Sequence, residues 1–446
     1  MLTHFYRPIT FVIALLVLTV GYTTAQESVF KSPARGWDVA GDVNLLWSKQ
    51  TKLELAPGEG VWVSIPQRKG GVDDLTSAMD YADVEVELSY LLATGTEATL
   101  YLGGIYPFVL SDSRGIDVPT AQSNGGIGGY APRQEVGRAP GLWQRLKIKF
   151  RASQFDAGGV RVAPATLVSA QLNGVMIHEN VQLLAPEGVS EKPKASVRIK
   201  PLNGSIAVKD VHMLPLADDQ SDRERNSPDP ILINADVNTT LRSFMDVPGS
   251  PRVVHAISVG HPQHVHYTYD LDKGKVIQVW RGGFLDATPM WHDRGNGTSR
   301  VLGSPIYFDQ PGLTIGKLAS QTDAWPTDTT GTGYKPKGYR MDAQELPIFR
   351  YQLYGGAVED SVRPLSGGEG FTRTISFRGA PEGAYLRLAA ASSIVDQGKG
   401  VYLIGDKAWY LKLEESGNAK PIIRDQPTGK ELLLPIRSNI RYSIIF

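Results

Sequence analysis

The chain of 446 residues contains no cysteine. This absence excludes disulfide bonds, thiolate metal sites, a cysteine nucleophile and the Cys-x-x-Cys-His attachment of a c-type haem. A lipoprotein anchor is excluded as well, because no cysteine follows the apolar segment near the start of the chain. Packing must therefore stabilise the fold, and we expect no cofactor.

The chain also lacks net charge, since 46 Lys and Arg residues balance 46 Asp and Glu residues. A broad electrostatic surface for nucleic acid or anionic lipid is therefore not expected. A neutral ligand fits this balance better, and we expect neither a nucleic acid nor a membrane as partner of the mature protein.

Long apolar runs are missing except for residues 9–20, which follow the basic Arg7 and lead to small residues ending at Ala25. A run of about a dozen residues is shorter than the roughly 20 that span a bilayer, and the pattern is typical of a secretory signal peptide. We expect residues 1–25 to be removed and the mature protein to be periplasmic or secreted. An uncleaved anchor is the alternative.

Amphipathic patterns of helical period longer than about three turns are also absent. The 47 glycines and 29 prolines indicate many tight turns, and runs with a period of two indicate half-buried strands. Such runs occupy residues 61–65, 84–90, 99–102, 146–150, 168–177, 253–257 and 442–446. Within one of them, Asn173-Gly174 predicts a hairpin turn. The sequence predicts an all-β fold.

A polar, charged segment that ends in proline, residues 217–230, predicts a linker between two domains. About 420 residues after cleavage also exceed what one hydrophobic core usually serves. We expect a first domain at 26–216 and a second β-rich domain at 231–446. Residues 320–337, dense in Thr, Gly and Pro, predict a long surface loop.

Several segments of the first domain occur in the order found in one known family. They are Gly36-Trp37, residues 80–88, Asp112-Ser113 and residues 139–144, 150–156, 172–180 and 208–216. On these segments residues 29–216 resemble the 3-keto-disaccharide hydrolase domains, formerly a domain of unknown function. The resemblance implies a concanavalin-like two-sheet jelly roll that cleaves keto-sugar glycosides.

The polar site of that family is only partly retained. Glu97-Ala98-Thr99 stands where the family usually has Asn-Ser-Gly, and Tyr106-Pro107-Phe108-Val109 replaces Tyr-Glu-Val-Gln. Residues 199–204 replace the turn Leu-Gln-Asp-His-Gly. Of the family's polar groups, Asp112 remains.

Cleavage of a 3-keto glycoside requires a base for the proton next to the ketone and an acid for the leaving oxygen. We expect Asp112, Glu135 and Glu179 as the catalytic carboxylates. Each has a structural alternative, Asp112 as a turn residue and the two glutamates as solvated carboxylates. Tyr106 and Tyr130 are expected to bind the ligand, whereas Trp143 is expected in the core.

Residues from about 231 onward resemble a β-rich module found beside haem c domains in secreted sugar-dehydrogenase-like bacterial proteins. The matching segments are residues 257–260, 267–270, 279–286, 291–295, 347–351 and 371–375. We expect a second domain of β-sandwich type. The haem partner of that family is a separate domain, so an electron-transfer role is not expected.

Aromatic and charged residues gather within the second domain, and such mixtures suit carbohydrate sites. The expected ligand-binding residues are Trp280, Arg281, Asp286, Trp291, His292 and Arg294. The alternative is a structural corner, in which Gly282-Gly283 forms a bulge and Arg281 pairs with Asp286 or Asp293.

Three histidines, His261, His264 and His266, stand close together nearby. In an extended segment His264 and His266 would point to one face and could share a metal ion. Asp270 or His292 could complete such a site. No motif fixes the third ligand, so a surface cluster is favoured and no metal is assigned.

Together these patterns favour an exported hydrolase-family protein that acts on keto-sugar glycosides or related saccharides. A non-catalytic saccharide-binding accessory protein is the alternative. A surface structural protein is a third class, which the absence of long repeats and low-complexity stalks disfavours.

Overall fold

The computed structural model describes residues 29–31, 35–66, 71–113, 115–116, 118–216, 229–308 and 312–446. The expected signal peptide and residues 217–228 of the expected linker lie outside these ranges. Strands hold 56% of the residues and helices 1%, which confirms the predicted all-β fold. Within the described ranges, no helix has the length and apolar character needed to span a bilayer.

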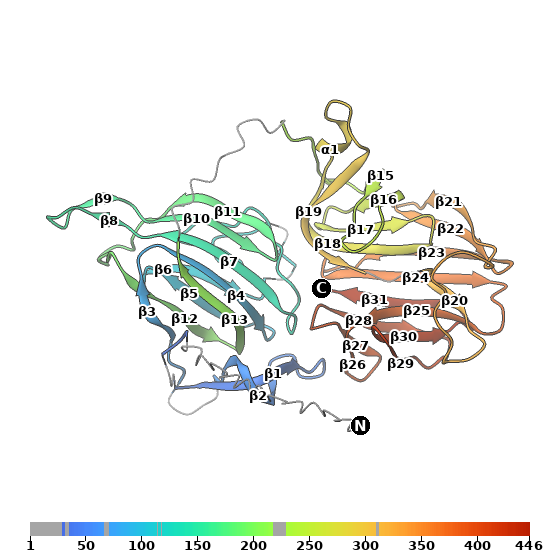
Figure 1. Cartoon of the computed structure of the whole chain (residues 1–446), viewed down its shortest axis with the longest axis horizontal. Coiled ribbons are helices and arrows are strands. Elements are labelled where there is room, and N and C mark those ends of the chain that lie inside the picture. Colours follow the sequence, from blue (N-terminus) through green and yellow to red (C-terminus); the bar gives the residue numbers. More distant parts are fainter. Residues whose placement is uncertain are drawn as a thin grey trace, which may run out of the picture.

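The first half of the chain forms two sheets packed face to face (Figure 1). The larger sheet has the order β1-β2-β13-β4-β7-β10-β11, the smaller one β3-β12-β5-β6, and β8 and β9 form a separate hairpin. The strands are β1 (Trp37–Leu45), β2 (Leu53–Ser64), β3 (Leu75–Tyr81), β4 (Val84–Leu92), β5 (Glu97–Leu102), β6 (Tyr106–Ser111), β7 (Gln144–Arg151), β8 (Gln154–Phe155), β9 (Arg161–Ala163), β10 (Thr166–Leu172), β11 (Val175–Gln182), β12 (Ala195–Asn203) and β13 (Ile206–Pro215).

Strand β4 shows why this sequence forms a sandwich. Val86 and Leu88 are buried in the core between the two sheets. Glu85 and Glu87 alternate with them and face outward, where Lys147 of the neighbouring strand β7 lies 2.8 Å from Glu85. Because successive side chains of a strand point to opposite faces, this alternation fixes which face is buried.

The predicted hairpin at Asn173-Gly174 joins β10 to β11. Both residues have positive φ angles, 52° and 83°. This is the backbone conformation that a tight two-residue turn requires and that Asn and Gly adopt most readily. The structure therefore confirms the predicted turn.

The second half of the chain forms three further sheets. The strand orders are β14-β18-β17-β16-β15-β19, β21-β22-β23-β24-β31-β28-β27-β26 and β20-β25-β30-β29, and β19 also pairs with β18 so that the first of these sheets closes on itself. The elements are β14 (Leu232–Ile233), β15 (Thr239–Met245), β16 (Val253–Gly260), β17 (Val265–Asp270), β18 (Lys275–Asp286), α1 (Thr288–Trp291), β19 (Thr298–Tyr307), β20 (Ile315–Lys317), β21 (Lys335–Met341), β22 (Pro347–Leu353), β23 (Gly356–Pro364), β24 (Gly370–Arg378), β25 (Ala384–Ala391), β26 (Ile394–Asp396), β27 (Val401–Ile404), β28 (Trp409–Glu415), β29 (Ile422–Gln426), β30 (Gly429–Pro435) and β31 (Ile440–Ile445).

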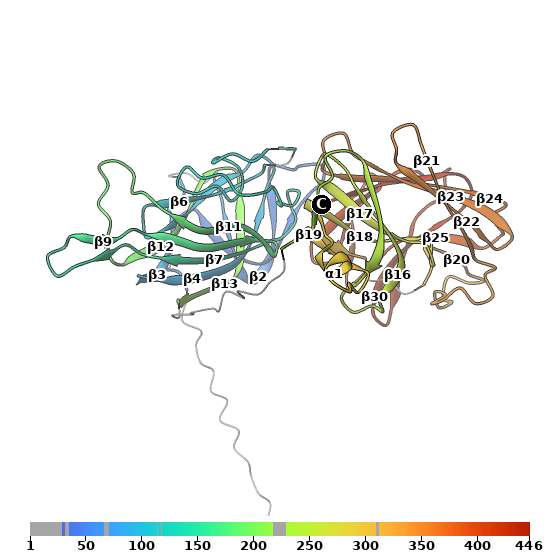
Figure 2. The same ribbon diagram turned by 90° about the horizontal axis from the view of Figure 1, so that it is seen from above.

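The two halves lie side by side, with β19 and the end of β31 at their boundary (Figures 1 and 2). A buried apolar cluster joins them and consists of Ala139, Leu142, Val401, Leu403, Tyr410 and Ile445. The buried ammonium group of Lys407 donates to both carboxylate oxygens of Asp42, at 2.7 and 2.9 Å. Apolar burial and an ion pair between a buried ammonium group and a half-exposed carboxylate together hold the halves in one arrangement. The position of the domain boundary stays a prediction.

Candidate functional site

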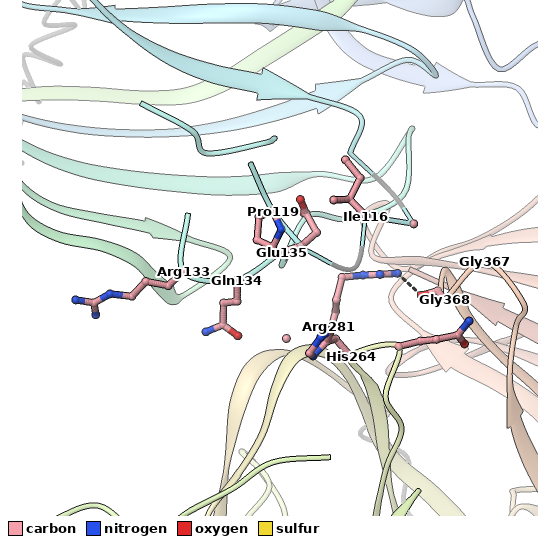
Figure 3. Close-up of a pocket in the computed structure, with 12 residues that line it drawn as sticks. Ile116, Pro119, Arg133, Gln134, Glu135, His264, Arg281, Gly367 and Gly368 are labelled. Atoms are coloured by element: carbon pink, nitrogen blue, oxygen red, sulfur yellow. Dashed lines mark hydrogen bonds between the residues drawn. The ribbon is translucent and has the colours of Figure 1, made fainter. Parts of the chain in front are cut away.

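A pocket lies where the two halves meet, between the β6–β7 connection of the first half and β18 of the second (Figure 3). Its volume is about 70 Å³. At the 10–15 Å³ that one water molecule needs, this is room for roughly five waters or one small polar ring. Glu135 and Gln134 line it from the first half, and His264, Arg281 and Gly368 line it from the second.

Glu135 is the buried carboxyl group of this pocket, with 7% of its surface exposed. The Ser113 hydroxyl donates to Oε2 at 2.5 Å, and the backbone N–H of Gly137 donates to Oε1 at 2.7 Å. Burial raises the pKa of Glu135, and these two hydrogen bonds offset the rise only in part. A glutamate in this state can exchange a proton closer to neutral pH than an exposed one can.

A buried polar network holds Ser113 in place behind Glu135. The backbone N–H of Asn124 donates to the Ser113 hydroxyl at 3.3 Å. The side chain of Asn124 accepts a hydrogen bond from Tyr90 at 2.9 Å and donates to Gln144 at 3.4 Å. Nothing in the sequence indicated Asn124, because the connection that contains it has no regular period. Gln144, the first residue of β7, was part of the matching segment 139–144 but was not indicated as a site residue.

Arg281 enters the pocket from strand β18 and is also buried, at 5% exposure. Its Nη2 donates to the carbonyl oxygen of Gly368 at 2.6 Å, the dashed line in Figure 3, and its guanidinium lies 5.9 Å from the ring of Phe446. The positive charge of Arg281 acts to lower the pKa of Glu135 against the effect of burial. Glu135 and Arg281, predicted for two different sites, thus lie at one pocket.

The other two carboxylates predicted to be catalytic do not line the pocket among the described residues, although the negative charge of Asp112 acts to raise the pKa of Glu135. Asp112 Oδ2 accepts a hydrogen bond from the backbone N–H of Gly95 at 3.2 Å, as a turn residue would. Glu179 pairs with Arg133 at 3.0 Å, and both side chains are more than half exposed. Neither Asp112 nor Glu179 lines the pocket among the described residues.

The two tyrosines of the first half that were expected to bind the ligand do not line the pocket either, among the described residues. Tyr106 is buried in the core, and its hydroxyl donates to the Glu191 carboxylate, so its ring has no face for a ligand. Tyr130 is exposed at the surface and is not part of the pocket lining. Trp143 is buried, as expected, and the ammonium group of Lys209 lies 4.4 Å from its ring centre.

Trp280 does not share a surface with Arg281. The two residues are neighbours on β18, so their side chains point to opposite faces of the strand. The indole of Trp280 is fully buried, lies parallel to the ring of Phe284 at 6.0 Å and donates to the Gly283 carbonyl at 3.0 Å. This tryptophan packs in the core, where it cannot stack on a sugar.

The remaining residues of the predicted cluster lie around the short helix α1. Asp286 accepts a hydrogen bond from the Thr288 backbone N–H at 2.8 Å and so closes the turn that leads into the helix. Trp291, His292 and Arg294 are exposed, and His292 pairs with Asp293 at 2.7 Å. The sequence cluster is therefore divided among the core, the pocket and an exposed loop.

The three histidines do not form a metal site within the described ranges. His264 lies before β17 and has a φ of 56°, which is not an extended conformation. The prediction that His264 and His266 point to one face of an extended segment is therefore wrong. His266 is buried, accepts the His261 backbone N–H at Nδ1 and contacts the Gly282 carbonyl through Nε2 at 2.8 Å. Burial lowers the pKa of His266 to about 3, so its ring stays neutral.

Comparisons with known proteins add no family. No family model matches the chain, and no curated protein matches it. Among solved structures, two candidate glycosyl hydrolases of Parabacteroides distasonis ATCC 8503 align at 15% and 13% identity. Each alignment covers 41% of this chain. The first covers 79% of the other chain with a TM-score of 0.32, and the second covers 89% with a TM-score of 0.27. The binding domain of botulinum neurotoxin serotype D aligns at 7% identity over 92% of both chains, with a TM-score of 0.23. With TM-scores below 0.5, none of these likenesses carries an argument.

Proposed function

We propose that this chain is an exported hydrolase that acts on keto-sugar glycosides, with its site in the pocket between the two halves. The observation that carries the proposal is the buried Glu135, whose pKa burial raises, at a pocket that Arg281 also lines. A partly desolvated carboxyl group and a cation at one small cavity suit proton transfer with stabilisation of a developing negative charge.

The chemistry of a 3-keto glycoside matches these groups. Ionised Glu135 removes the proton from the carbon between the ketone and the anomeric carbon, and the electrons of that C–H bond form an enolate. Arg281 stabilises the negative charge of the enolate oxygen. When the enolate collapses, the ketone re-forms, the anomeric C–O bond breaks and the leaving oxygen takes a proton. Water then adds across the new carbon–carbon double bond. Its hydroxyl group bonds to the anomeric carbon and a proton returns to the neighbouring carbon, which yields the free keto sugar.

His264 supplies a second titratable group to the same pocket from the other half of the molecule. A base and an acid are both needed for this reaction, and neither Asp112 nor Glu179 lines the pocket to provide one. We assign His264 the protonation of the leaving oxygen.

The test is release of sugar from a 3-keto glucoside by the purified chain and by Glu135→Gln. We expect the variant to lose at least about 100-fold in kcat, the usual contribution of a positioned acid or base. Glu59→Gln, which changes an exposed glutamate of β2 outside the pocket, is the matched control and should keep the wild-type rate. No release by the wild type, or an unchanged rate in Glu135→Gln, would contradict the proposal.

A non-catalytic saccharide-binding protein is the second candidate. It is favoured by one observation, that Glu135 is the one carboxylate among the described residues that line the pocket. This candidate predicts binding of a keto-sugar glycoside without turnover, with equal affinity in the wild type and in a variant that keeps the shape of the pocket. Calorimetric titration of both proteins beside the release assay separates the two functions.

Export is a proposal that rests on the sequence of residues 1–25. Expression of the whole chain in a bacterium with an outer membrane should yield a protein that starts after Ala25 and is recovered in the periplasm or the medium. Recovery of the uncut chain in the cytoplasm would contradict this.

A further inference from the structure

We propose that a groove between strand β19 and the Asn173-Gly174 hairpin is a second saccharide site, separate from the Glu135 pocket, and that it binds a neutral oligosaccharide chain. The groove has a volume of about 590 Å³, within the range of 300–1,000 Å³ that is usual for ligand sites. It is also far roomier than the Glu135 pocket. The hairpin at Asn173-Gly174 in the first half and the β19 strand in the second both line it.

One part of the groove is apolar and includes an aromatic ring. Tyr307, the last residue of β19, lines the groove with 40% of its surface exposed. Val301, Gly303 and Pro305 precede it at every second position, so they line the same face of the strand. A row of small apolar residues beside an exposed tyrosine leaves room for a flat ring to stack on the tyrosine.

The rest of the lining can hydrogen-bond to hydroxyl groups. Arg300 and Asn296 are exposed there, and Asp246 is held by Arg252 at 2.8 and 3.0 Å. Among the described residues of the lining, Arg300 and Asp246 are the charged ones, and Arg252 already neutralises Asp246. The lining therefore has no cluster of like charges that would select a polyanion, and a neutral ligand fits it.

The groove and the Glu135 pocket are separated by the pairing of β18 with β19. Gly282 of β18 lines the pocket, and Gly303 of β19 lines the groove. These two glycines are partners in the pairing of the strands, so the paired backbones lie between the two sites. Gln134 closes the boundary, because its side chain accepts the Gly283 backbone N–H at 2.7 Å and donates to the Leu302 carbonyl at 3.4 Å. The two sites can therefore be tested separately.

The experiment is native affinity electrophoresis of the whole mature chain in gels that contain laminarin, glucomannan or, for comparison, dextran sulfate. We expect retardation by at least one of the two neutral glycans. Tyr307→Ala should weaken the apparent affinity at least fivefold, and Tyr307→Phe should retain it because the ring face is kept. Tyr339→Ala, which removes a tyrosine of similar exposure on β21, is the matched control and should bind like the wild type.

The results separate this proposal from the proposed hydrolase. Glu135→Gln should abolish sugar release and leave the retardation unchanged, whereas Tyr307→Ala should weaken retardation and leave cleavage of a small 3-keto glucoside unchanged. The groove proposal is overturned if neither neutral glycan retards the wild type, if dextran sulfate alone does, or if Tyr307→Ala and Tyr339→Ala behave alike. Circular dichroism of each variant verifies that a loss of binding is not a loss of fold.

Discussion

Two of the buried carboxyl groups, Glu135 in the first half and Asp360 in the second, have very different hydrogen-bond partners. Asp360 in the second half accepts hydrogen bonds from Arg373 at 2.6 and 3.0 Å and from Tyr269 at 2.8 Å. Glu135 in the first half accepts hydrogen bonds from a hydroxyl and a backbone amide, which are neutral donors. A full positive charge therefore contacts Asp360 directly, whereas no charged group donates a hydrogen bond to Glu135.

The pKa shifts follow from this difference. Burial acts to lower the pKa of Arg373, but the negative charge of Asp360 outweighs burial and holds the pKa well above its usual value. Burial of Glu135 outweighs its hydrogen bonds and the more distant charge of Arg281, so its pKa is raised. A fully paired buried charge stabilises one structure, whereas a partly compensated one at the wall of a pocket is available for proton transfer.

The largest expected effect comes from breaking the paired network. Arg373→Ala leaves Asp360 buried without its cation, and we expect the free energy of unfolding of the second half to fall by about 3–5 kcal/mol. Urea denaturation followed by circular dichroism measures this change. Arg340→Ala removes an arginine whose ion pair with Glu359 is exposed, at 3.6 Å, and should cost at most about 1 kcal/mol. Equal losses in the two variants would remove the distinction between the paired network and a surface pair.

A smaller effect is expected from Ser113→Ala in the first half. The Ser113 hydroxyl lowers the pKa of Glu135, so its removal should raise that pKa further and destabilise the fold by about 1 kcal/mol. The pKa is measured by NMR of chain labelled with ¹³C in the glutamate carboxyl groups, with Glu135→Gln used for assignment. An unchanged or lower pKa in Ser113→Ala would show that the network behind Glu135 does not set its charge state.

Patterns confined to one strand or one turn could be predicted from the sequence. The alternation of β4 and the Asn173-Gly174 turn depend on neighbouring residues, and both were predicted correctly. The predicted strand at residues 146–150 lies within β7 for the same reason. Local chemistry is sufficient wherever a period of two or a positive φ angle decides the structure.

The candidate site could be predicted only in part. Glu135 was named from the sequence, but its position beside Arg281 depends on how the two halves pack, which no local pattern encodes. Strand alternation already separates Trp280 from Arg281, so grouping them by sequence proximity ignored the direction of their side chains. His264 was misplaced because a turn, rather than a strand, precedes Val265.

The most direct test of the central claim, that Glu135 is a buried and incompletely compensated acid, is the stability of the wild type and of Glu135→Gln across pH. A folded-state pKa above the unfolded value of about 4.3 means that the native state keeps its proton where the unfolded chain has lost it. This contribution to stability is complete below about pH 4.3 and is lost as the pH rises through the folded-state pKa. We therefore predict that the stability of the wild type relative to Glu135→Gln falls with rising pH, by up to about 1.4 kcal/mol per pH unit. A difference that stays constant, or that grows as the pH rises, would contradict the account.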